Sequence, residues 1–545
     1  MKIVVFTNAA HQRKYIDTVR SAVAGTSDVV VESVEAGLEE TDDDKKGEAG
    51  GSESLLSYIR SFVKGAAALG SRAGRILAKI LLSPLYLTYY AERGLRRFAR
   101  RHKMTFLRPS KFLRKHPRVV AGFEKVLRAL LSILRKLSPP AALGFIVRTC
   151  SKIWSFYKRQ SLAYAVFSET LWRDYLAERL FSRNPDLIVL LEDNAEGLTG
   201  LVSHMARQRS IPYVVLPDYI PNPAEPARYY FDNPQHSADS LTGRVIRYFA
   251  PRWILEYDGK RLLRLPGNAV FVRWMRGQHC PQPWILNAGY AEAILLESRA
   301  SVKHYEKLGF FSQKLKVIGG ATEDSLHEIA LRKDELRRML DAEYGFSADK
   351  PLVICGLPPD QYTAATEGFE FRSYEELCRQ WFAALEAVTD RANVLAVRHP
   401  RMKAEVFAPY LKGRVRLANR SLDGILPACD LYIACISTTI RWALALGIPV
   451  LNYDTYRYDY GDFSSAHGCL EVTSVEAFQQ ALETMLLPGG LDEIRSAAAA
   501  DASEWGLTDG KFKERLRDTL LEVRRTYKGR TTPTHAGNYR LKKLS

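Results

Sequence analysis

Residues 430–454, DLYIACISTTIRWALALGIPVLNYD, decide the fold of this chain. The run LYIA at 431–434 is short, apolar and bounded by polar residues, which is typical of a buried strand. Residues 438–446 then place apolar side chains at helical spacing, and VLNY at 450–453 resumes strand character after Gly447 and Pro449. A strand, a helix and a second strand in this order form one βαβ unit, which predicts a parallel sheet.

The same alternation extends through most of the chain. Before residue 220, the pattern predicts strands at residues 2–7, 28–33, 186–191 and 212–216, and helices at 12–24, 161–181 and 198–209. After residue 290, it adds strands at 293–297, 316–318, 352–356, 394–398 and 415–417, and helices at 299–308, 323–344, 374–389, 424–428 and 475–487. We therefore predict an α/β protein with two Rossmann-like doubly wound domains facing a cleft, at which the carboxyl ends of both sheets bind ligand.

The domain boundaries follow from composition. We assign residues 1–34 and 161–310 to an N-terminal domain, within which the eight prolines of residues 221–285 indicate a loop-rich insertion over the sheet edge. Residues 311–510 form the C-terminal domain, with its first strand at 316–318. A C-terminal helix at 511–527 and a disordered basic tail at 528–545 complete the chain.

Composition excludes several classes of protein. Hydrophobic residues make up 46% of the 545 residues, so the chain is not wholly disordered. The seven cysteines are scattered and form no CxxC pair, which argues against a disulfide scaffold or a zinc site and favours a reducing cytosol. The N-terminus MKIVVFTNAA turns polar too early for a signal peptide and suits a first core strand.

The net charge of +17 is concentrated in one segment. Residues 55–159 hold 24 Lys and Arg against two acidic residues, so the rest of the chain is slightly acidic, at −5. An acidic, Gly-rich linker at 35–54 precedes this insert, which we bound at residues 55–160 and expect to be helical and amphipathic. Its longest uncharged run has 12 residues, whereas a spanning helix needs about 20.

Three interpretations of the insert remain open. Its helices could pack on the protein itself, lie on an anionic membrane surface, or bind nucleic acid. The Leu, Ile and Phe beside the basic residues favour the membrane surface. No RRM, KH, helix-turn-helix or finger motif accompanies the charge, so we expect no nucleic-acid partner.

The C-terminal domain carries the strongest candidates for chemistry. Arg398 and His399 directly follow a predicted strand that Pro400 ends, so His399 should lie at the carboxyl end of the sheet. An imidazole there can contact a phosphate or protonate a leaving oxygen near neutral pH. The alternative is a loop histidine with a structural hydrogen bond. We predict a functional His399, with Arg398 as a further ligand-binding residue.

Three hydroxyl residues, Ser437, Thr438 and Thr439, lie where the strand of 431–434 passes into the following helix. Hydroxyls and free N–H groups at a helix start can hold a phosphate, although a plain N-cap uses the same residues. Because His399 is in the same domain, we favour phosphate binding. Gly356, which ends a strand, and Gly319, at a turn or hinge, would allow close approach of backbone to ligand.

In the N-terminal domain, the sequence EDNAEG at 192–197 follows the predicted strand DLIVLL. Glu192 or Asp193 could take a proton from an acceptor hydroxyl, or Asp193 or Asn194 could cap the following helix. Asp218 is a weaker candidate. His204 and His236 stand alone in the sequence and are interpreted as structural. We find no Walker A, GxGxxG, HExxH or GxSxG motif, and predict no metal site.

These residues resemble a known family. The stretches KLKVIGGATEDSL, RHPR and 430–454 are similar to the C-terminal domain of GT-B glycosyltransferases of bacterial surface-polysaccharide synthesis, a group near sialyl- and Kdo-transferases, CDP-glycerol glycerophosphotransferases and UDP-N-acetylglucosamine 2-epimerase. The resemblance implies that Asp193 or Glu192 is the base, that His399 binds phosphate or acts as acid, and that Ser437, Thr438 and Thr439 hold the phosphate. Arg441 and Trp442 stand where many relatives carry a ribose-binding Glu.

The resemblance leads us to expect a metal-independent glycosyltransferase. Its co-substrate would be a CMP-, UDP- or GDP-linked sugar, with no tightly bound cofactor. Its acceptor would be a glycan or a lipid-linked glycan at the inner face of the plasma membrane, where residues 55–159 would hold the enzyme. The alternatives are a CDP-alcohol phosphotransferase or sugar-nucleotide 2-epimerase, and a non-catalytic membrane-associated assembly protein with a degenerate fold.

Overall fold

The computed structural model describes residues 1–7, 10–36, 162–218, 221–361, 369–399, 402–459, 461–527 and 543–544. The basic insert, the linker from residue 37 onward and all of the tail except Lys543–Leu544 lie outside the described residues. The expectations for these segments therefore stay predictions.

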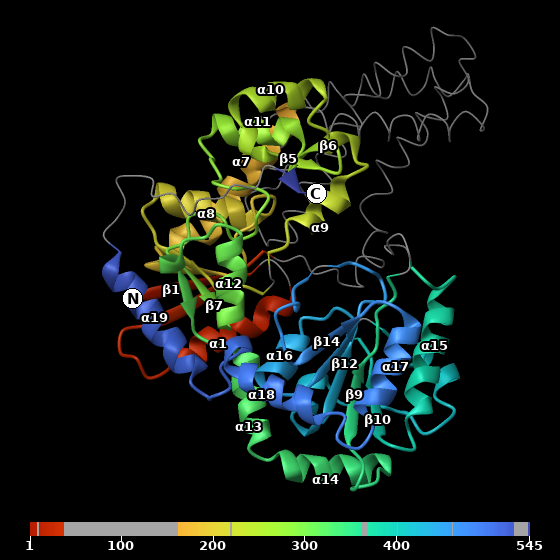
Figure 1. Cartoon of the computed structure of the whole chain (residues 1–545). Helices are drawn as coiled ribbons and strands as arrows, with labels where there is room; N and C mark the ends of the chain where they lie inside the picture. The colour runs from red at the N-terminus through yellow and green to blue at the C-terminus, as the bar shows by residue number, and fades with distance from the viewer. Residues whose placement is uncertain are drawn as a thin grey trace, which may run out of the picture. The chain divides into compact units, whose positions relative to one another are not determined.

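The chain forms two compact units. The first unit comprises Met1–Asp17, Asp28–Ala291 and Lys528–Ser545, and the second unit comprises Thr18–Ser27 and Glu292–Tyr527. Parallel strands alternate with helices in both (Figure 1). The predicted α/β fold class, with two mostly parallel sheets, is confirmed.

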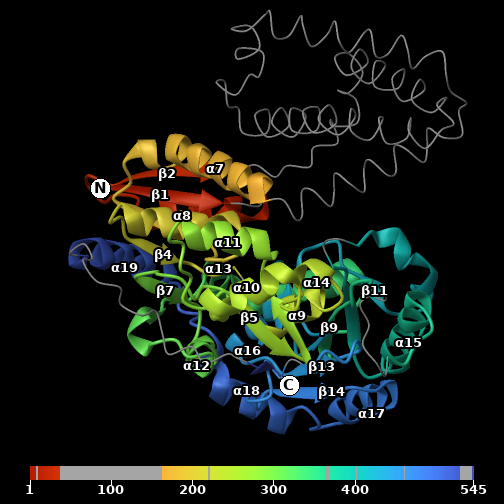
Figure 2. The same ribbon diagram turned by 90° about the horizontal axis from the view of Figure 1, so that it is seen from above.

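In the first unit, four parallel strands lie in the order β2-β1-β3-β4. Their bounds are Lys2–Thr7 (β1), Val30–Glu35 (β2), Leu187–Leu190 (β3) and Tyr213–Val215 (β4), and the intervening helices are Ala10–Arg13 (η1), Lys14–Ala22 (α1), Leu162–Arg179 (α7), Phe181–Arg183 (η3) and Leu198–Gln208 (α8). Every residue of β3 is buried, as expected for a strand covered on both faces. Helices α7 and α8 run beside these strands (Figures 1 and 2).

Residues 221–285 form helices and a hairpin, so the predicted loop-rich insertion is wrong. The elements are Ala224–Tyr230 (α9), Pro234–His236 (η4), Leu241–Phe249 (α10), Pro251–Trp253 (η5), Ile254–Tyr257 (β5), Lys260–Leu263 (β6) and Gly267–Met275 (α11). Pro223 and Pro266 are the N-cap residues of α9 and α11, and Pro234 and Pro251 begin η4 and η5. Proline is tolerated at helix starts because the N–H it lacks has no partner there. The tail residues Lys543–Leu544 (β15) pair with β5.

The second unit begins with two parallel strands, Ala293–Leu296 (β7) and Leu315–Val317 (β8), separated by Arg299–Lys307 (α12) and Ser312–Lys314 (η6). Strand β8 pairs with β7 and is no part of the second sheet, so the assignment of residues 316–318 to that sheet is wrong. A three-residue strand shows no periodicity that could tell one sheet from another.

The second sheet has the strand order β11-β10-β9-β12-β13-β14, and its strands are parallel. The strands are Leu352–Gly356 (β9), Asn393–Val397 (β10), Arg416–Leu417 (β11), Leu431–Ala434 (β12), Val450–Tyr453 (β13) and Cys469–Val472 (β14). The helices are Ala321–Ala330 (α13), Lys333–Tyr344 (α14), Tyr374–Ala387 (α15), Ile440–Ala445 (α16), Val475–Met485 (α17), Asp492–Trp505 (α18) and Phe512–Thr526 (α19), and the 3-10 turns are Ala404–Val406 (η8), Ala408–Tyr410 (η9), Leu422–Gly424 (η10) and Leu426–Ala428 (η11).

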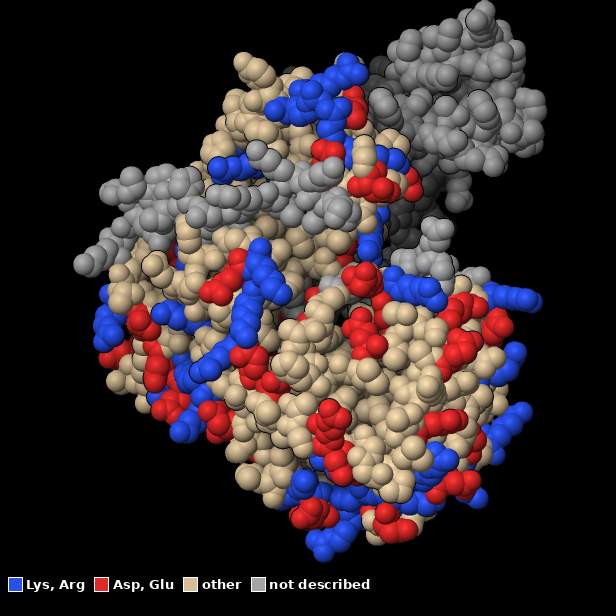
Figure 3. Space-filling view, in the orientation of Figure 1, with Lys and Arg blue, Asp and Glu red and all other residues tan. Residues whose placement is uncertain are grey.

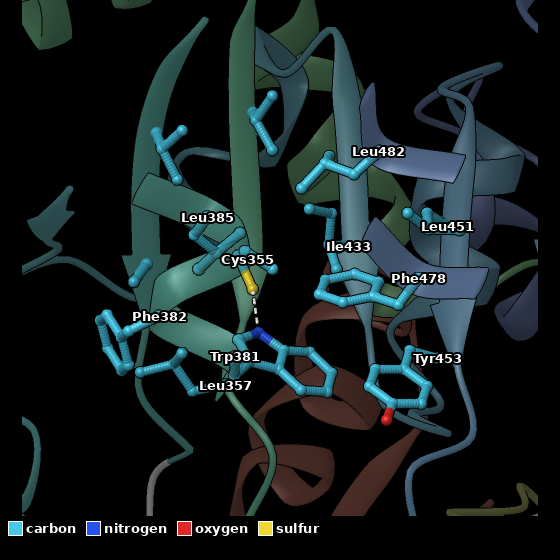
Figure 4. Packing of buried hydrophobic residues seen from close by; sticks show 14 of the residues in the cluster. Cys355, Leu357, Trp381, Phe382, Leu385, Ile433, Leu451, Tyr453, Phe478 and Leu482 are labelled. Carbon is cyan, nitrogen blue, oxygen red and sulfur yellow. Dashed lines mark hydrogen bonds between the residues drawn. The ribbon is translucent and has the colours of Figure 1, made fainter. Parts of the chain in front are cut away.

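Helices cover both faces of the second sheet. Val353 and Cys355 of β9 pack with α15 and α17, whereas Leu352 and Ile354 of the same strand pack with α13, α14 and α16. Successive side chains of a strand point to opposite faces, so this division shows the doubly wound arrangement directly. On the first of these faces, Trp381 donates its indole N–H to the Cys355 Sγ at 3.1 Å and packs against the rings of Tyr453 and Phe478 (Figure 4).

The surface of the described chain carries both signs of charge. On the face shown in Figure 3, Lys and Arg alternate with Asp and Glu. Among the described residues, no helix combines the length and the hydropathy needed to cross a bilayer.

Candidate functional site

The candidate residues of the second unit lie at one edge of its sheet. Strands β10, β9 and β12 are neighbours, with Val397 opposite Gly356 and Cys355 opposite Ile433. Their carboxyl ends are therefore level. Gly356 ends the middle strand β9, and His399 and the segment 435–439 follow the ends of β10 and β12 on either side of it. Since neighbouring strands are about 4.8 Å apart, the outer two are separated by roughly 10 Å.

The turn after β12 has an unusual backbone. Ile436 has φ = +41°, in the left-handed region that a β-branched residue rarely enters. The side chain of Asn452, which is fully buried, holds the turn because its Oδ1 accepts the Ile436 N–H at 2.9 Å. Asn452 in turn donates to Glu471 Oε2 at 3.2 Å. Backbone conformations of this kind cluster at ligand-binding sites, where the surrounding structure maintains them.

Three hydroxyl groups form a chain beside this turn. Thr439 Oγ1 lies 2.6 Å from Tyr432 OH and 2.8 Å from Ser437 Oγ, and Ser437 Oγ accepts the Thr439 N–H at 3.3 Å. The side chain of Thr438 is exposed. Tyr432 was not singled out in the sequence because it lies within an otherwise apolar strand. Its phenol orients the two hydroxyls and leaves Thr438 directed to solvent.

The helix after this turn is shorter than predicted. Helix α16 spans Ile440–Ala445, not residues 438–446, so Thr438 and Thr439 precede it. Thr439 is the N-cap residue, yet its side chain makes no capping hydrogen bond. The Thr439 side chain therefore does not cap α16, whereas Ser437 Oγ, which accepts the Thr439 N–H, binds a backbone N–H at the helix start as the capping alternative expected. A six-residue helix also has a small dipole, so the hydroxyls and backbone N–H groups of the turn are the main polar groups here.

Gly356 is required by close packing. A Cβ at this position would lie 2.8 Å from Tyr432 OH, nearer than real contacts allow. Any larger residue at the end of β9 would therefore push Tyr432 away from Thr439. Because glycine has no side chain, no side-chain atoms of residue 356 cover the backbone between His399 and the hydroxyl chain.

Arg398, His399 and Gly319 have different surroundings. Arg398 is exposed and donates from Nη1 to the Met402 carbonyl oxygen at 2.8 Å, which closes the turn around His399. The backbone carbonyl of His399 accepts the Met402 N–H at 2.8 Å. Gly319 has φ = +81° and lies against Arg515 and Leu507, so its neighbours belong to the C-terminal segment and not to the hydroxyl chain.

Arg441, one turn beyond the hydroxyl chain, forms an ion pair through Nη1 with Glu297 Oε1. Its side chain is only 12% exposed. Glu297 directly follows β7, so this basic residue links α16 to the end of β7 within the second unit.

In the first unit, Asp193 lies in a closed polar network. Its Oδ2 accepts hydrogen bonds from Tyr213 OH at 2.6 Å and Ser203 Oγ at 3.0 Å. Its backbone N–H donates to Asn287 Oδ1 at 2.8 Å, and its carbonyl accepts the Asn287 N–H at 2.9 Å. Tyr213 OH also accepts the Tyr290 N–H at 2.5 Å. The carboxylate therefore joins β4 to α8, and the Asp193 backbone and the Tyr213 hydroxyl connect them to the segment 287–290.

Burial controls the ionisation of this network. It raises the pKa of Asp193 to about 6, against the hydrogen bonds from Tyr213 and Ser203, which lower it. Burial and the neighbouring carboxylate raise the pKa of Tyr213 well above its usual value, so the phenol keeps its proton and donates. The alternative in which Asp193 caps the following helix is not observed, because the N-cap residue of α8 is Gly197.

The other sequence candidates of the first unit lie nearby. Glu192 is half-buried and its charge contributes to the raised pKa of Asp193. Asp218 accepts a hydrogen bond from Tyr15 OH at 2.8 Å. His236 is buried, bonds to the Leu263 carbonyl through Nδ1 at 2.8 Å and stacks on Tyr230, which agrees with a structural role. Within the described ranges, no three His, Cys, Asp or Glu side chains gather as a metal site requires.

Known proteins resemble this chain in structure at low sequence identity. No family model and no curated protein matches the chain. Solved structures similar to it include UDP-GlcNAc 2-epimerase from Neisseria meningitidis bound to UDP-GlcNAc, at 11% identity and TM-score 0.44 over 96% of this chain and 100% of that one. The S. aureus MnaA–UDP complex is 12% identical, with TM-score 0.43 over 96% and 97%. The wall teichoic acid polymerase TagF is 12% identical, with TM-score 0.37 over 62% and 73%. The proposal for the function of this chain therefore depends on the residues of its own site and not on these similarities.

Proposed function

We propose that this chain is a metal-independent glycosyltransferase whose second unit binds the phosphate of a nucleotide-activated sugar. One observation carries the proposal: a hydroxyl chain, a bare glycine and a histidine follow the level carboxyl ends of three adjacent parallel strands. Ligands of open α/β sheets bind at such edges. Neutral donors and an imidazole suit a phosphate that gains charge as it leaves.

Each residue then has a role in the transfer. The hydroxyl groups of Ser437, Thr438 and Thr439 would hold the phosphate oxygens. His399 would bind or protonate the leaving phosphate from the opposite side of Gly356. As the acceptor hydroxyl attacks the anomeric carbon, the new C–O bond forms, the bond to phosphate oxygen breaks, and the hydroxyl proton passes to a base.

We assign the base to Glu192 and not to Asp193. The Oδ2 of Asp193 already accepts two hydrogen bonds, and the residue is 4% exposed. Glu192 follows the same strand and is half-buried, so it is more open to solvent than Asp193. Asp193 is then a positioning residue that fixes the loop carrying Glu192.

Nucleotide binding tests the site in the second unit. Thermal shift and calorimetry with CMP, CDP, UDP and GDP should identify one nucleotide that stabilises the protein, also in EDTA. His399→Ala should weaken its binding by roughly 10- to 100-fold, as expected for loss of a hydrogen bond to a charged group. The matched control is His467→Ala, which removes an exposed histidine of the same unit that pairs with Asp501. Equal affinity in the two variants would contradict the assignment of His399.

Transfer assays test the base. Glu192→Gln should lower sugar transfer by roughly 10²- to 10⁴-fold, the range expected for loss of general base catalysis, and should leave nucleotide binding unchanged. Undiminished transfer would remove Glu192 from the mechanism. Failure of the wild-type protein to bind any of the nucleotides would instead favour the non-catalytic alternative.

We also propose that the acceptor is a glycan or lipid-linked glycan of a bacterial surface polysaccharide, at the inner face of the plasma membrane. The charge of the insert supports the membrane location, since basic residues near an anionic surface contribute about 1 kcal/mol each, and the acceptor class follows from the family resemblance alone. In flotation with anionic vesicles, the full chain should rise with the vesicles and a variant lacking residues 55–159 should not. Equal flotation of both proteins would refute this role.

A further inference from the structure

The first unit contains a cavity that the proposed function does not use. Its volume is about 590 Å³, within the range of small-molecule sites. It lies between the end of α8, the η5 turn after α10 and the segment that follows α11. The lining residues that determine its chemistry are His204, Arg207, Phe249, Arg252, Trp274 and Tyr290.

His204 is one of the residues that line this cavity. The residue is 7% exposed, and its buried Nε2 makes no hydrogen bond with the described residues. Leaving a buried polar atom unpaired costs about 1–3 kcal/mol, so such atoms usually have a protein, water or ligand partner. In the sequence His204 stood alone and was interpreted as structural, but its place in the fold indicates a function.

The cavity is electropositive. Arg207 and Arg252 line it, and no Asp or Glu of the described residues does. The pKa of His204 is lowered to about 3, first by burial and then by the charges of Arg173, Arg207, His279 and Arg273. Arg173 and Arg273 are paired with Glu169, so the positive charge that would attract an anion into the cavity is that of the lining residues Arg207 and Arg252.

The walls of the cavity are apolar. Phe249, Trp274 and Tyr290 contribute rings, and the Arg207 guanidinium lies over the Tyr290 ring, 3.7 Å from its centroid. This stacking holds the guanidinium in place without neutralising its charge. A ligand with a charged head and an apolar body would match both features of the cavity.

We propose that this cavity binds an organic phosphate, with its anionic head between Arg207, Arg252 and His204 and its apolar body against Phe249 and Trp274. The proposal is independent of the nucleotide site in the second unit. The anion would pair with the guanidinium groups of Arg207 and Arg252, and the body would cover the rings of Phe249 and Trp274. A lipid phosphate and an aromatic phosphate share this chemistry.

Calorimetry on the full chain distinguishes these sources with three probes: octyl phosphate, phenyl phosphate and the neutral octyl glucoside, all below micelle-forming concentrations. At least one phosphate ester should bind at least about 10-fold more tightly than octyl glucoside, since a charge-assisted hydrogen bond contributes about 1.5–3 kcal/mol. Preference for the octyl ester indicates a lipid-like body, and preference for the phenyl ester indicates an aromatic one.

The double substitution Arg207→Gln with Arg252→Gln should weaken the binding of the preferred ester by at least about 10-fold. Nucleotide binding should stay unchanged.

The matched control is Arg244→Gln with Arg247→Gln, which removes two arginines of α10 that lie outside the cavity, near Asp239. This variant should bind the phosphate ester as the wild type does. If loss of Arg207 from its ring destabilises the fold, Arg252→Gln alone carries the test, because its side chain is exposed. Equal binding of the neutral probe, no binding of either ester at millimolar concentration, or full affinity without the lining arginines would overturn the proposal.

Discussion

Replacing Gly289 by alanine is expected to lower the free energy of unfolding of the first unit by about 3 kcal/mol or more, because overpacking costs about 1–3 kcal/mol and each buried partner left unpaired adds about 1–3 kcal/mol. A Cβ at this buried position would lie 1.8 Å from Asp193 Oδ2. The carboxylate cannot move aside without losing its hydrogen bonds from Tyr213 and Ser203. Urea denaturation measures the difference.

Gly197→Ala is the control for this effect. Gly197 lies in the loop that follows Asp193 and has φ = −80°, and a Cβ added there would have its nearest neighbouring atoms at 3.6 Å, which is ordinary contact. It should change stability little. Adding Asp193→Ala to Gly289→Ala should remove the clash, so the two substitutions together should cost less than the sum of their separate effects. Additive effects would show that Gly289 acts independently of the carboxylate.

The second large effect concerns pH. The pKa of Asp193 is raised from its usual 3.8 to about 6 in the folded protein, so folding favours the protonated carboxyl. The resulting stability is fully present below about pH 4 and is lost as the pH rises through about 6. One pKa unit corresponds to about 1.4 kcal/mol, so the loss by about pH 7 is on the order of 3 kcal/mol.

Asp193→Asn cannot ionise and should lack this dependence. Between about pH 4 and about pH 7, the unfolding free energy of the variant should therefore rise by roughly 3 kcal/mol relative to that of the wild type. Burial also raises the pKa of Glu323, but this group is present in both proteins and cancels in the difference. Parallel stability curves for the two proteins over this range would show that Asp193 is not perturbed by burial.

The sequence was sufficient to predict the strands whose position depends only on the burial of their side chains. The strands Lys2–Thr7, Leu352–Gly356, Leu431–Ala434 and Val450–Tyr453 have the predicted bounds. Each is a short apolar run with turn-forming or polar residues at both ends, and a fully buried parallel strand requires nothing else. The place of His399, Gly356 and the hydroxyl residues at one sheet edge followed from the order of these strands.

Features that depend on distant partners could not be predicted. Asp193 meets Ser203, Tyr213 and Asn287, which are 10, 20 and 94 residues away, and no local pattern relates them. The same holds for the contact of Gly356 with Tyr432. The prolines of residues 221–285 were interpreted as loop residues. Proline is also favoured at the first positions of a helix, but the sequence does not show where each of these helices begins. The unpaired Nε2 of His204 could not be predicted either, because the surroundings of a side chain are known only after folding.

The contact between α13 and α19 has a consequence for synthesis on the ribosome. The Phe512 N–H donates to Asp324 Oδ1 at 3.1 Å across 188 residues, and Phe512, Leu516 and Leu520 of α19 are buried. At about 5–20 residues per second, translation separates these partners by roughly 10–40 s. During that interval, the nascent second unit exposes the apolar surface that α19 later covers, which is the kind of surface that chaperones bind.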